Sequence, residues 1–238
     1  MLIAVFLHLL SAFEVSSHDN ALEMFHTHNN RLYNTLMANY TKQISPYYTN
    51  HHVKNIPNEW RHPHPMVTSL TLTFLRIIKV DQMEQVMKII ASIRMIWSDY
   101  RLKWDPKDYG GIEYVYLNRA NIWVPEIRVA NTESADDVVP EYKQNVMINY
   151  TGHVLWYNDV MSNSVCRLET NDFPFDVQNC SLCLIESLFN KNESTIHPVI
   201  SKRVFAKIEN SGNGEWDVEN ISLSRLFIDD YENVQFDL

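Results

Sequence analysis

The segment from residue 87 to 97 alternates between two kinds of side chain, and this pattern constrains the fold more than any other feature. Its odd-numbered positions are all apolar: Met87, Ile89, Ala91, Ile93, Met95 and Trp97. The even-numbered positions include Lys88, Ser92 and Arg94. Because successive side chains of a strand point to opposite faces, the pattern predicts a β-strand whose odd face lies in the core. The even face is polar enough to meet water or a partner subunit.

Shorter strands are predicted on both sides of this segment. Leu70, Leu72 and Phe74 alternate with threonines, as in a half-buried strand. Turn signals then recur: Asp105-Pro106, Gly110-Gly111, Asn131, Asp136-Asp137 and Gly152. No long helical pattern follows residue 40, so the chain is expected to form one all-β sandwich domain.

One helix is predicted before the strands, from about Ala21 to Met37. An apolar stripe at near-helical spacing supports it: Leu22, Phe25, Leu32 and Leu36. The chain starts with an apolar run from Leu2 to Phe13, which is too short to span a bilayer as a helix. We interpret residues 1–17 as a signal peptide and residues 18–238 as the domain, with a membrane-surface or buried helix as the alternative.

Potential glycosylation sites support a secretory location. Asn-x-Ser/Thr sequons occur at Asn39, Asn149, Asn179, Asn192 and Asn220. Together with the predicted signal peptide, they favour an extracellular or cell-surface protein. No later stretch approaches the ~20 apolar residues that a transmembrane helix needs.

Several function classes are disfavoured. The formal net charge is −9 and no basic run stands out, whereas nucleic-acid binding needs clustered Lys and Arg. The His-rich stretch from Tyr47 to Pro65 lacks a complete ligand set, so a surface loop is favoured over a metal site. No nucleophile–base grouping or phosphate loop is found. We therefore expect no enzyme, cofactor or metal.

The chain contains three cysteines: Cys166, Cys180 and Cys183. In an oxidising compartment a pair should bond. Cys166 and Cys180 enclose thirteen residues, and closing a loop of that size stabilises a fold by about 3 kcal/mol. Inside the loop, Phe173, Pro174, Phe175 and Asp176 place a rigid turn between two aromatic rings. An exposed apolar tip of this kind usually contacts something, although a generic disulfide hairpin is the simpler interpretation.

This spacing, with Phe-Pro-Phe-Asp just before the second cysteine, resembles the signature loop of Cys-loop receptors, the pentameric ligand-gated ion channels. The run from Gln178 to Ser181 resembles the nicotinic acetylcholine receptor branch. Other segments match family motifs in the same order: Trp97 to Pro106, Trp123 to Glu126, Tyr150 to Trp156, and Gly214 to Trp216. The resemblance covers residue 21 to the end.

The resemblance implies a ten-stranded immunoglobulin-like β-sandwich with an N-terminal α-helix. It also implies a Cys166–Cys180 disulfide and assembly with identical or related subunits in a ring of five. In the family, a ligand lies between neighbouring subunits in a cage of aromatic rings that attract a cation. The disulfide loop passes the binding change to the membrane helices. Cys183 is then left over, as a free or intermolecular thiol or simply a buried small residue.

Most positions that match the aromatic cage are not aromatic in this chain. The first-loop tyrosine falls on Ala130, the second-loop tryptophan on Ser187, and the complementary-face tryptophan on Ser92. Phe189 is the ring nearest to Ser187. The vicinal cysteine pair of the third loop is absent. The usual ammonium cage would therefore keep one or two rings.

Four further positions are candidates for the same pocket. Tyr231 matches a cage aromatic, Phe227 is a possible second, and Trp156 matches a family tryptophan on the complementary side. Tyr231 is equally compatible with a core role. Arg94 lies two residues from Ser92 on the same face, where it could pair with an anionic ligand or form an intersubunit salt bridge.

The leading hypothesis is the extracellular ligand-binding domain of a divergent, nicotinic-like channel subunit without the usual acetylcholine cage. Its membrane attachment would then come from a C-terminal channel domain outside this chain, and its ligand remains open. One alternative is a secreted, channel-free pentamer similar to acetylcholine-binding proteins. Another is an adhesion-type β-sandwich that binds no small molecule.

Overall fold

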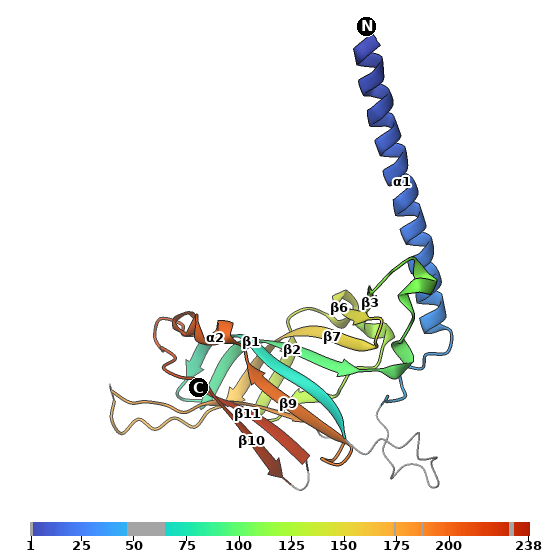
Figure 1. Ribbon diagram of the computed structural model, residues 1–238. Helices are drawn as coiled ribbons and strands as arrows, with labels where there is room; N and C mark the ends of the chain where they lie inside the picture. The colour runs from blue at the N-terminus through green and yellow to red at the C-terminus, as the bar shows by residue number, and fades with distance from the viewer. Residues whose placement is uncertain (1, 47–64, 174, 187, 229–230) are drawn as a thin grey trace, which may run out of the picture.

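A computed structural model describes residues 2–46, 65–173, 175–186, 188–228 and 231–238. In these residues the chain forms a β-sandwich with a long N-terminal helix (Figure 1), which confirms the predicted fold class. The His-rich stretch lies almost wholly outside the described residues. The helices are α1 Leu2–Met37 and α2 Lys202–Phe205. The strands are β1 Met66–Asp81, β2 Val86–Ser98, β3 Tyr114–Asn118, β4 Ile127–Val129, β5 Thr132–Asp137, β6 Asn145–Asn149, β7 His153–Val165, β8 Ser181–Glu186, β9 Ser194–Ile200, β10 Ser222–Ile228 and β11 Tyr231–Asp237.

The strands form two sheets. The larger one has the order β3-β6-β7-β2-β1-β9, with β5 added beside β7, and the smaller one has the order β10-β11-β8-β4. β1 and β9 run parallel, whereas the other pairs are antiparallel. The described residues contain eleven strands, one more than expected.

The core lies between the two sheets and follows the predicted alternation. Every odd position of β2 from Met87 to Trp97 is buried, which confirms the predicted core face. From the smaller sheet, Leu182 and Leu184 of β8 and Val234 and Phe236 of β11 are also buried. Ser92 and Arg94 lie half-buried on the opposite face of β2.

Helix α1 ends at Met37, as predicted, but it begins at Leu2 rather than near Ala21. Leu32 and Leu36 are buried against the sandwich, whereas Leu22 and Phe25 of the predicted stripe are exposed. The helix leaves the end of the sandwich steeply (Figure 1), so its earlier turns have no sheet beneath them. Among the described helices, none has the length and apolarity needed to cross a membrane.

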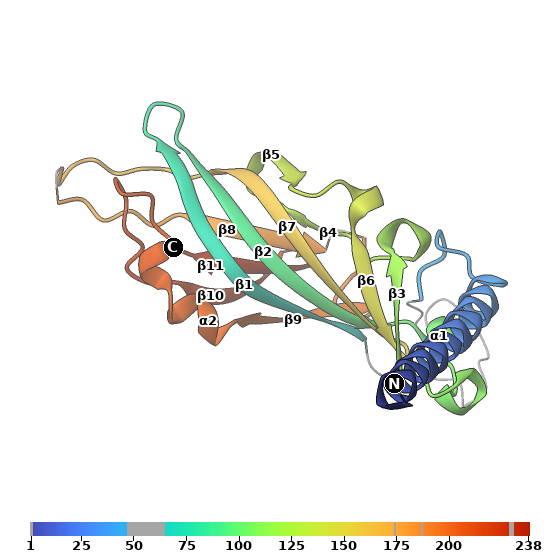
Figure 2. The same cartoon turned by 90° about the horizontal axis from the view of Figure 1, so that it is seen from above.

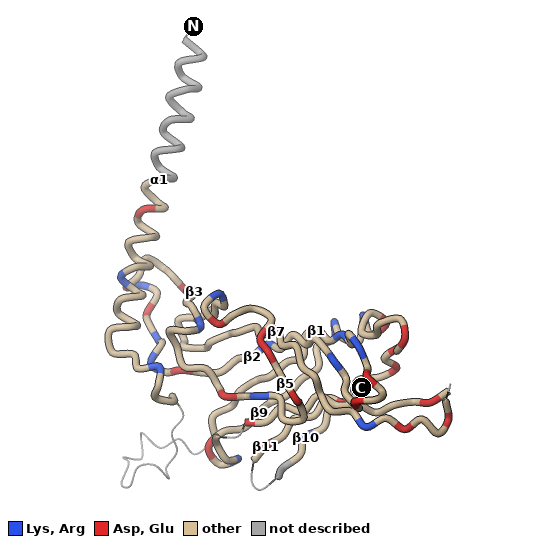
Figure 3. The backbone as a smooth tube through the Cα atoms, turned by 180° about the vertical axis from the view of Figure 1, so that it is seen from behind, with Lys and Arg blue, Asp and Glu red and all other residues tan. Residues whose placement is uncertain are grey.

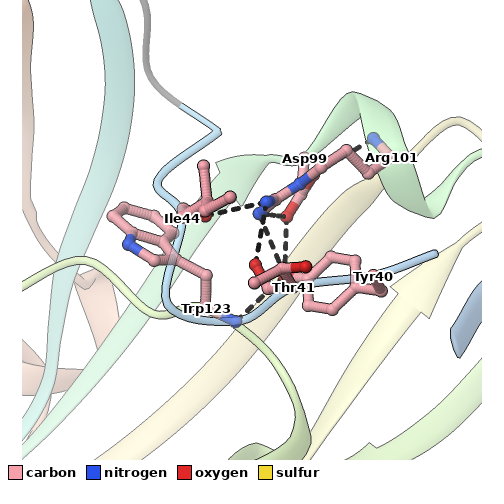
Figure 4. Close-up of polar contacts among 6 residues, drawn as sticks. All are labelled: Tyr40, Thr41, Ile44, Asp99, Arg101 and Trp123. Atoms are coloured by element: carbon pink, nitrogen blue, oxygen red, sulfur yellow. Dashed lines mark hydrogen bonds and ion pairs between the residues drawn. The ribbon is translucent and has the colours of Figure 1, made fainter.

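A buried ion pair fixes the chain that follows α1 to the sheet (Figure 4). Asp99 is fully buried, and its carboxylate accepts hydrogen bonds from Arg101 Nε at 2.8 Å and Arg101 Nη2 at 2.7 Å. The Tyr40 hydroxyl donates to Asp99 Oδ2 at 2.8 Å and accepts from the Trp123 N–H at 2.9 Å. Burial raises the pKa of Tyr40 above its usual value, so this hydroxyl stays a donor.

Arg101 extends the same cluster to the chain after the helix. Its Nη1 donates to the carbonyl of Ile44 at 2.7 Å and of Thr41 at 3.2 Å. Its guanidinium also lies 4.4 Å from the centre of the Tyr40 ring. We name Tyr40, Asp99, Arg101 and Trp123 the Asp99 cluster. It joins three separate parts of the sequence at the α1 end of the domain.

Candidate functional site

The disulfide loop lies at the end of the sandwich opposite α1, beside the C-terminus (Figure 2). Cys166 and Cys180 are bonded, with their Cα atoms 5.1 Å apart, so the predicted disulfide is confirmed. Cys166 follows β7, and Cys180 precedes β8, and both are buried. The bond therefore closes the loop where the two strands enter the core.

Backbone contacts also hold the base of this loop. The Cys166 N–H donates to the Gln85 carbonyl at 2.9 Å, and the Leu168 N–H donates to Gln85 Oε1 at 2.6 Å. Gln85 ends the β1–β2 turn with a left-handed φ of 57°. On the other side, Cys180 and Leu238 exchange two backbone hydrogen bonds of 3.1 and 2.7 Å. The loop is thus connected to the β1–β2 turn and to the end of β11.

The tip of the loop presents apolar side chains to solvent. Phe173 is 71% exposed and Phe175 is 87% exposed, while Pro174 lies outside the described residues. Gln178 braces the loop, because its amide donates to the Glu169 carbonyl at 2.7 Å and accepts from the Glu169 N–H at 2.8 Å. The same amide donates to the Asp176 carboxylate. Acidic residues occur on both sides of the tip, and Arg167 follows Cys166 at the base of the loop (Figure 3).

The positions that match the aromatic cage lie on several elements. Ala130 is exposed just after β4, where its N–H donates to the Cys183 carbonyl at 2.8 Å. Tyr231 begins β11 and is half-buried, and Phe189 is half-buried beyond the end of β8. Ser187 and the side chain of Phe227 lie outside the described residues.

Trp156 lies in the sandwich interior rather than on an open face. The residue is 3% exposed, and its Nε1 donates to Gln144 Oε1 at 3.0 Å. The Arg119 guanidinium lies 4.3 Å from the ring centre and covers one face. Arg119 is also within 3.8 Å of the carboxylates of Asp137 and Glu141. Within this chain, the ring therefore already has a cation partner.

Arg94 lies on the outer face of the larger sheet, between Thr71 of β1 and Tyr157 of β7. Its Nη2 donates to Thr71 Oγ1 at 3.2 Å. Its buried Nε has no hydrogen-bond partner among the described residues. Ser92, two residues earlier, lies opposite Phe74 and Asp159.

Cys183 is a free, half-buried thiol on β8. Its Sγ is 3.4 Å from Gln235 Oε1, and burial raises the pKa of this thiol. At neutral pH it is therefore mainly protonated.

Four of the five sequon asparagines are exposed: Asn39, Asn179, Asn192 and Asn220. Asn149 is half-buried, and its Oδ1 accepts hydrogen bonds from the backbone of Thr151 and His153.

Two buried glutamates beside the cage positions were missed from the sequence. Glu186 directly precedes Ser187, and Glu232 directly follows Tyr231. The signal that could have revealed Glu186 is the alternation of β8, because Leu182, Leu184 and Glu186 all occupy core positions. A carboxyl group at a core position of a strand requires a specific partner or a proton.

Gln85→Ala should destabilise the domain by about 1–3 kcal/mol, because the Leu168 N–H would lose its acceptor in a partly buried site. Gln85→Glu is the matched control, since it keeps an acceptor oxygen at the same reach. Urea unfolding and amide exchange at Leu168 would measure the effect. Equal losses in the two variants would show that this hydrogen bond contributes nothing.

Comparisons with known proteins agree with this arrangement. Residues 29–236 match the family described as the neurotransmitter-gated ion-channel ligand binding domain. The chain is 32% identical to the rat neuronal acetylcholine receptor subunit alpha-3 over 152 residues, which cover 64% of this chain and 28% of the relative. It is 30% identical to the Xenopus laevis acetylcholine receptor subunit alpha-1-A over 186 residues, which cover 78% of this chain and 37% of the relative.

A third relative extends the match. The rat neuronal acetylcholine receptor subunit alpha-6 is 31% identical over 192 residues, which cover 81% of this chain and 36% of the relative. The chain thus spans about a third of the length of the curated relatives it matches. With its two-sheet sandwich, its Cys166–Cys180 loop and a family match over most of its length, the chain belongs to the ligand-binding domain family of nicotinic-like Cys-loop receptors.

Proposed function

We propose that the domain is the extracellular part of a pentameric, nicotinic-like channel subunit whose interface pocket lacks the usual acetylcholine cage. The observation that carries this proposal is the residue at the first-loop position. Ala130 is held beside β8 by its hydrogen bond to Cys183, and it offers no ring to a ligand. Ser187 and Ser92 at two further cage positions support the same interpretation.

The relatives are acetylcholine receptor subunits, and we place this domain in a subunit of that kind, in a ring with identical or related subunits. Residues 1–17 would act as the signal peptide, and Asn39, Asn149, Asn179, Asn192 and Asn220 would be the glycosylation sites. The exposed tip of Phe173 and Phe175 would transmit the state of the domain to a channel domain. Arg94 would contact an anionic group of the ligand or of the neighbouring subunit.

The ligand pocket should bind acetylcholine and nicotine far more weakly than a complete aromatic cage. A desolvated cation–π contact contributes up to about 2 kcal/mol, so losing three rings should cost about 3–6 kcal/mol. This loss corresponds to an affinity about two to four orders of magnitude weaker. Calorimetric titration of the expressed domain with either compound should therefore show no binding at micromolar concentration.

The titration needs an assembled ring, since the pocket lies between subunits. Light scattering should first show a pentamer, because a strict monomer would favour the adhesion-type alternative. The variant Ala130→Tyr/Ser187→Trp restores two rings and should gain measurable affinity, while Glu133→Gln is a surface control. Micromolar binding by the unchanged domain would contradict the proposal.

A further inference from the structure

Glu186, at the end of β8, and Glu232, at the start of β11, bring two carboxyl groups into the sandwich interior. Asn233 of β11 pairs with Ile185 of β8, so Glu232 and Glu186 occupy the next opposed positions of the same two strands. Glu186 is 2% exposed, and Glu232 is similarly buried. Two ionised carboxylates at such positions would repel each other in a poorly solvated site.

Both side chains reach across the sandwich to β9, which belongs to the larger sheet. Glu232 Oε2 accepts hydrogen bonds from Thr195 Oγ1 and the Ile196 N–H, each at 2.8 Å. Glu186 Oε2 lies 2.7 Å from Ser194 Oγ. The two glutamates therefore connect β8 and β11 of one sheet to β9 of the other through polar contacts.

The two carboxyl groups differ in their charge partners. Arg225 of β10 forms an ion pair with Glu232, and its Nε donates to Glu232 Oε1 at 2.6 Å. Glu186 has Ser194 as its hydrogen-bond partner, while its Oε1 is buried without a partner among the described residues. Glu232 is thus compensated as an anion, whereas an ionised Glu186 would leave an unpaired oxygen in the core.

Among the described residues, β9 and β4 place uncharged groups beside Glu186. β9 supplies the Ser194 hydroxyl, and β4 places Ile127 opposite Glu186. Ser194 Oγ donates to Glu186 Oε2, and this hydrogen bond joins β8 to β9. A proton on the unpartnered Oε1 would remove the charge that otherwise faces Glu232 in the core.

We propose that Glu186, Ser194 and Glu232 form a proton-linked tie between the two sheets, closed when Glu186 is neutral and loosened by repulsion between the two carboxylates when Glu186 loses its proton. The step is a simple dissociation, in which the carboxylic acid releases a proton to solvent and becomes a carboxylate. Because Glu232 adjoins Tyr231 at the start of β11, loosening the tie would act on this end of β11, where the proposed ligand pocket has one of its positions. The tie itself is independent of which ligand the pocket binds.

The electrostatic surroundings support a proton on Glu186 near neutral pH. Burial, and secondarily the charge of Glu232, raises the pKa of Glu186 to about 7, although the Ser194 hydrogen bond opposes the shift. The folded state therefore binds this proton more tightly than the unfolded state, in which the pKa is about 4.5. The contribution of Glu186 to stability is complete below that lower value and decreases as the pH rises towards 7.

The test compares urea unfolding of the disulfide-intact domain and of Glu186→Gln from pH 5 to pH 8. In the unchanged domain, the Glu186 contribution to the ratio of folded to unfolded protein should fall by about a hundredfold over this range. Glu186→Gln, an uncharged isostere, should lack this component. The exposed Glu133→Gln should follow the unchanged domain. Parallel pH dependences of the unchanged domain and Glu186→Gln would overturn the proposal.

Two further measurements keep the proposal testable if Glu186→Gln fails to fold. Infrared spectroscopy of the unchanged domain should show a protonated carboxyl group at pH 6 that is lost by pH 8. Amide exchange at Ile196, corrected for the intrinsic effect of pH, should accelerate over the same interval, while exchange in the middle of β2 should change less. Absence of the carboxyl signal, or uniform acceleration in β2 and β9, would refute the tie.

Discussion

Asp99→Ala should destabilise the domain by about 3–5 kcal/mol, because it removes one partner of a buried ion pair. Arg101, whose side chain is mostly buried, would keep its charge without a carboxylate. The Tyr40 hydroxyl would lose its acceptor at the same time. A typical domain is stable by about 5–15 kcal/mol, so this single change should remove a large share of the total.

Asp105→Ala is a matched control for Asp99→Ala. Asp99 precedes the 3₁₀ helix Tyr100–Leu102, Asp105 precedes the 3₁₀ helix Pro106–Tyr109, and each carboxylate accepts the N–H two residues later. Asp105 is exposed, so its loss should cost about 1 kcal/mol, as for other capping residues. Urea unfolding would measure both variants. Equal losses would show that the buried ion pair adds nothing beyond the cap.

A double-mutant cycle separates the interaction energy of the Asp99–Arg101 ion pair from the stability lost with the packing of the two side chains. If the charges interact as described, Asp99→Ala/Arg101→Ala should be less destabilised than the sum of the two single variants. The reason is that the double variant leaves no uncompensated charge. The loss of stability that remains in the double variant would measure the contribution of other contacts. These are the contacts of Arg101 with the Thr41 and Ile44 carbonyls and with the Tyr40 ring.

The sandwich itself could be predicted because alternation is a local property of the sequence. The alternation of apolar residues over a few positions predicts the buried odd face of β2. The helical spacing of apolar residues over a few turns predicts the end of α1 at Met37. The exposure of Leu22 and Phe25 could not be predicted in this way. Their spacing fits the helical stripe, but the sheet surface ends at the last turns of α1, and only the assembled fold reveals that end.

The candidate site was harder to predict because its environment comes from distant segments. Trp156 is buried since Arg119 and Gln144, from other elements, cover its ring and bind its N–H. The role of Glu186 depends on Ser194 and on the opposed Glu232, which no single strand pattern contains. By contrast, the Cys166–Cys180 bond was implied by the resemblance of this loop to the Cys-loop signature, and it is confirmed.

The double variant Cys166→Ala/Cys180→Ala should lose about 3 kcal/mol of stability, the value expected for opening a loop of about 15 residues. Alanine is the suitable replacement because both cysteines are buried and a serine hydroxyl would need a partner there. Replacing both also avoids a new pairing between Cys180 and the free Cys183. Cys183→Ala, at a half-buried position on β8, is the control and should cost less than about 1 kcal/mol.

Where in the domain this stability is lost tests the role of the disulfide more sharply than how much is lost. Gln85 and Leu238 hold the base of the loop by backbone and side-chain hydrogen bonds that do not involve sulfur. The loop should therefore stay in place in the folded variant, and the disulfide should act chiefly by restricting the unfolded chain. Amide exchange at Leu168 and in β2 should then accelerate by the same factor, about a hundredfold for 3 kcal/mol. If Leu168 accelerates far more than β2, the disulfide instead fixes the loop locally, and the hydrogen bonds of Gln85 are not sufficient to hold it.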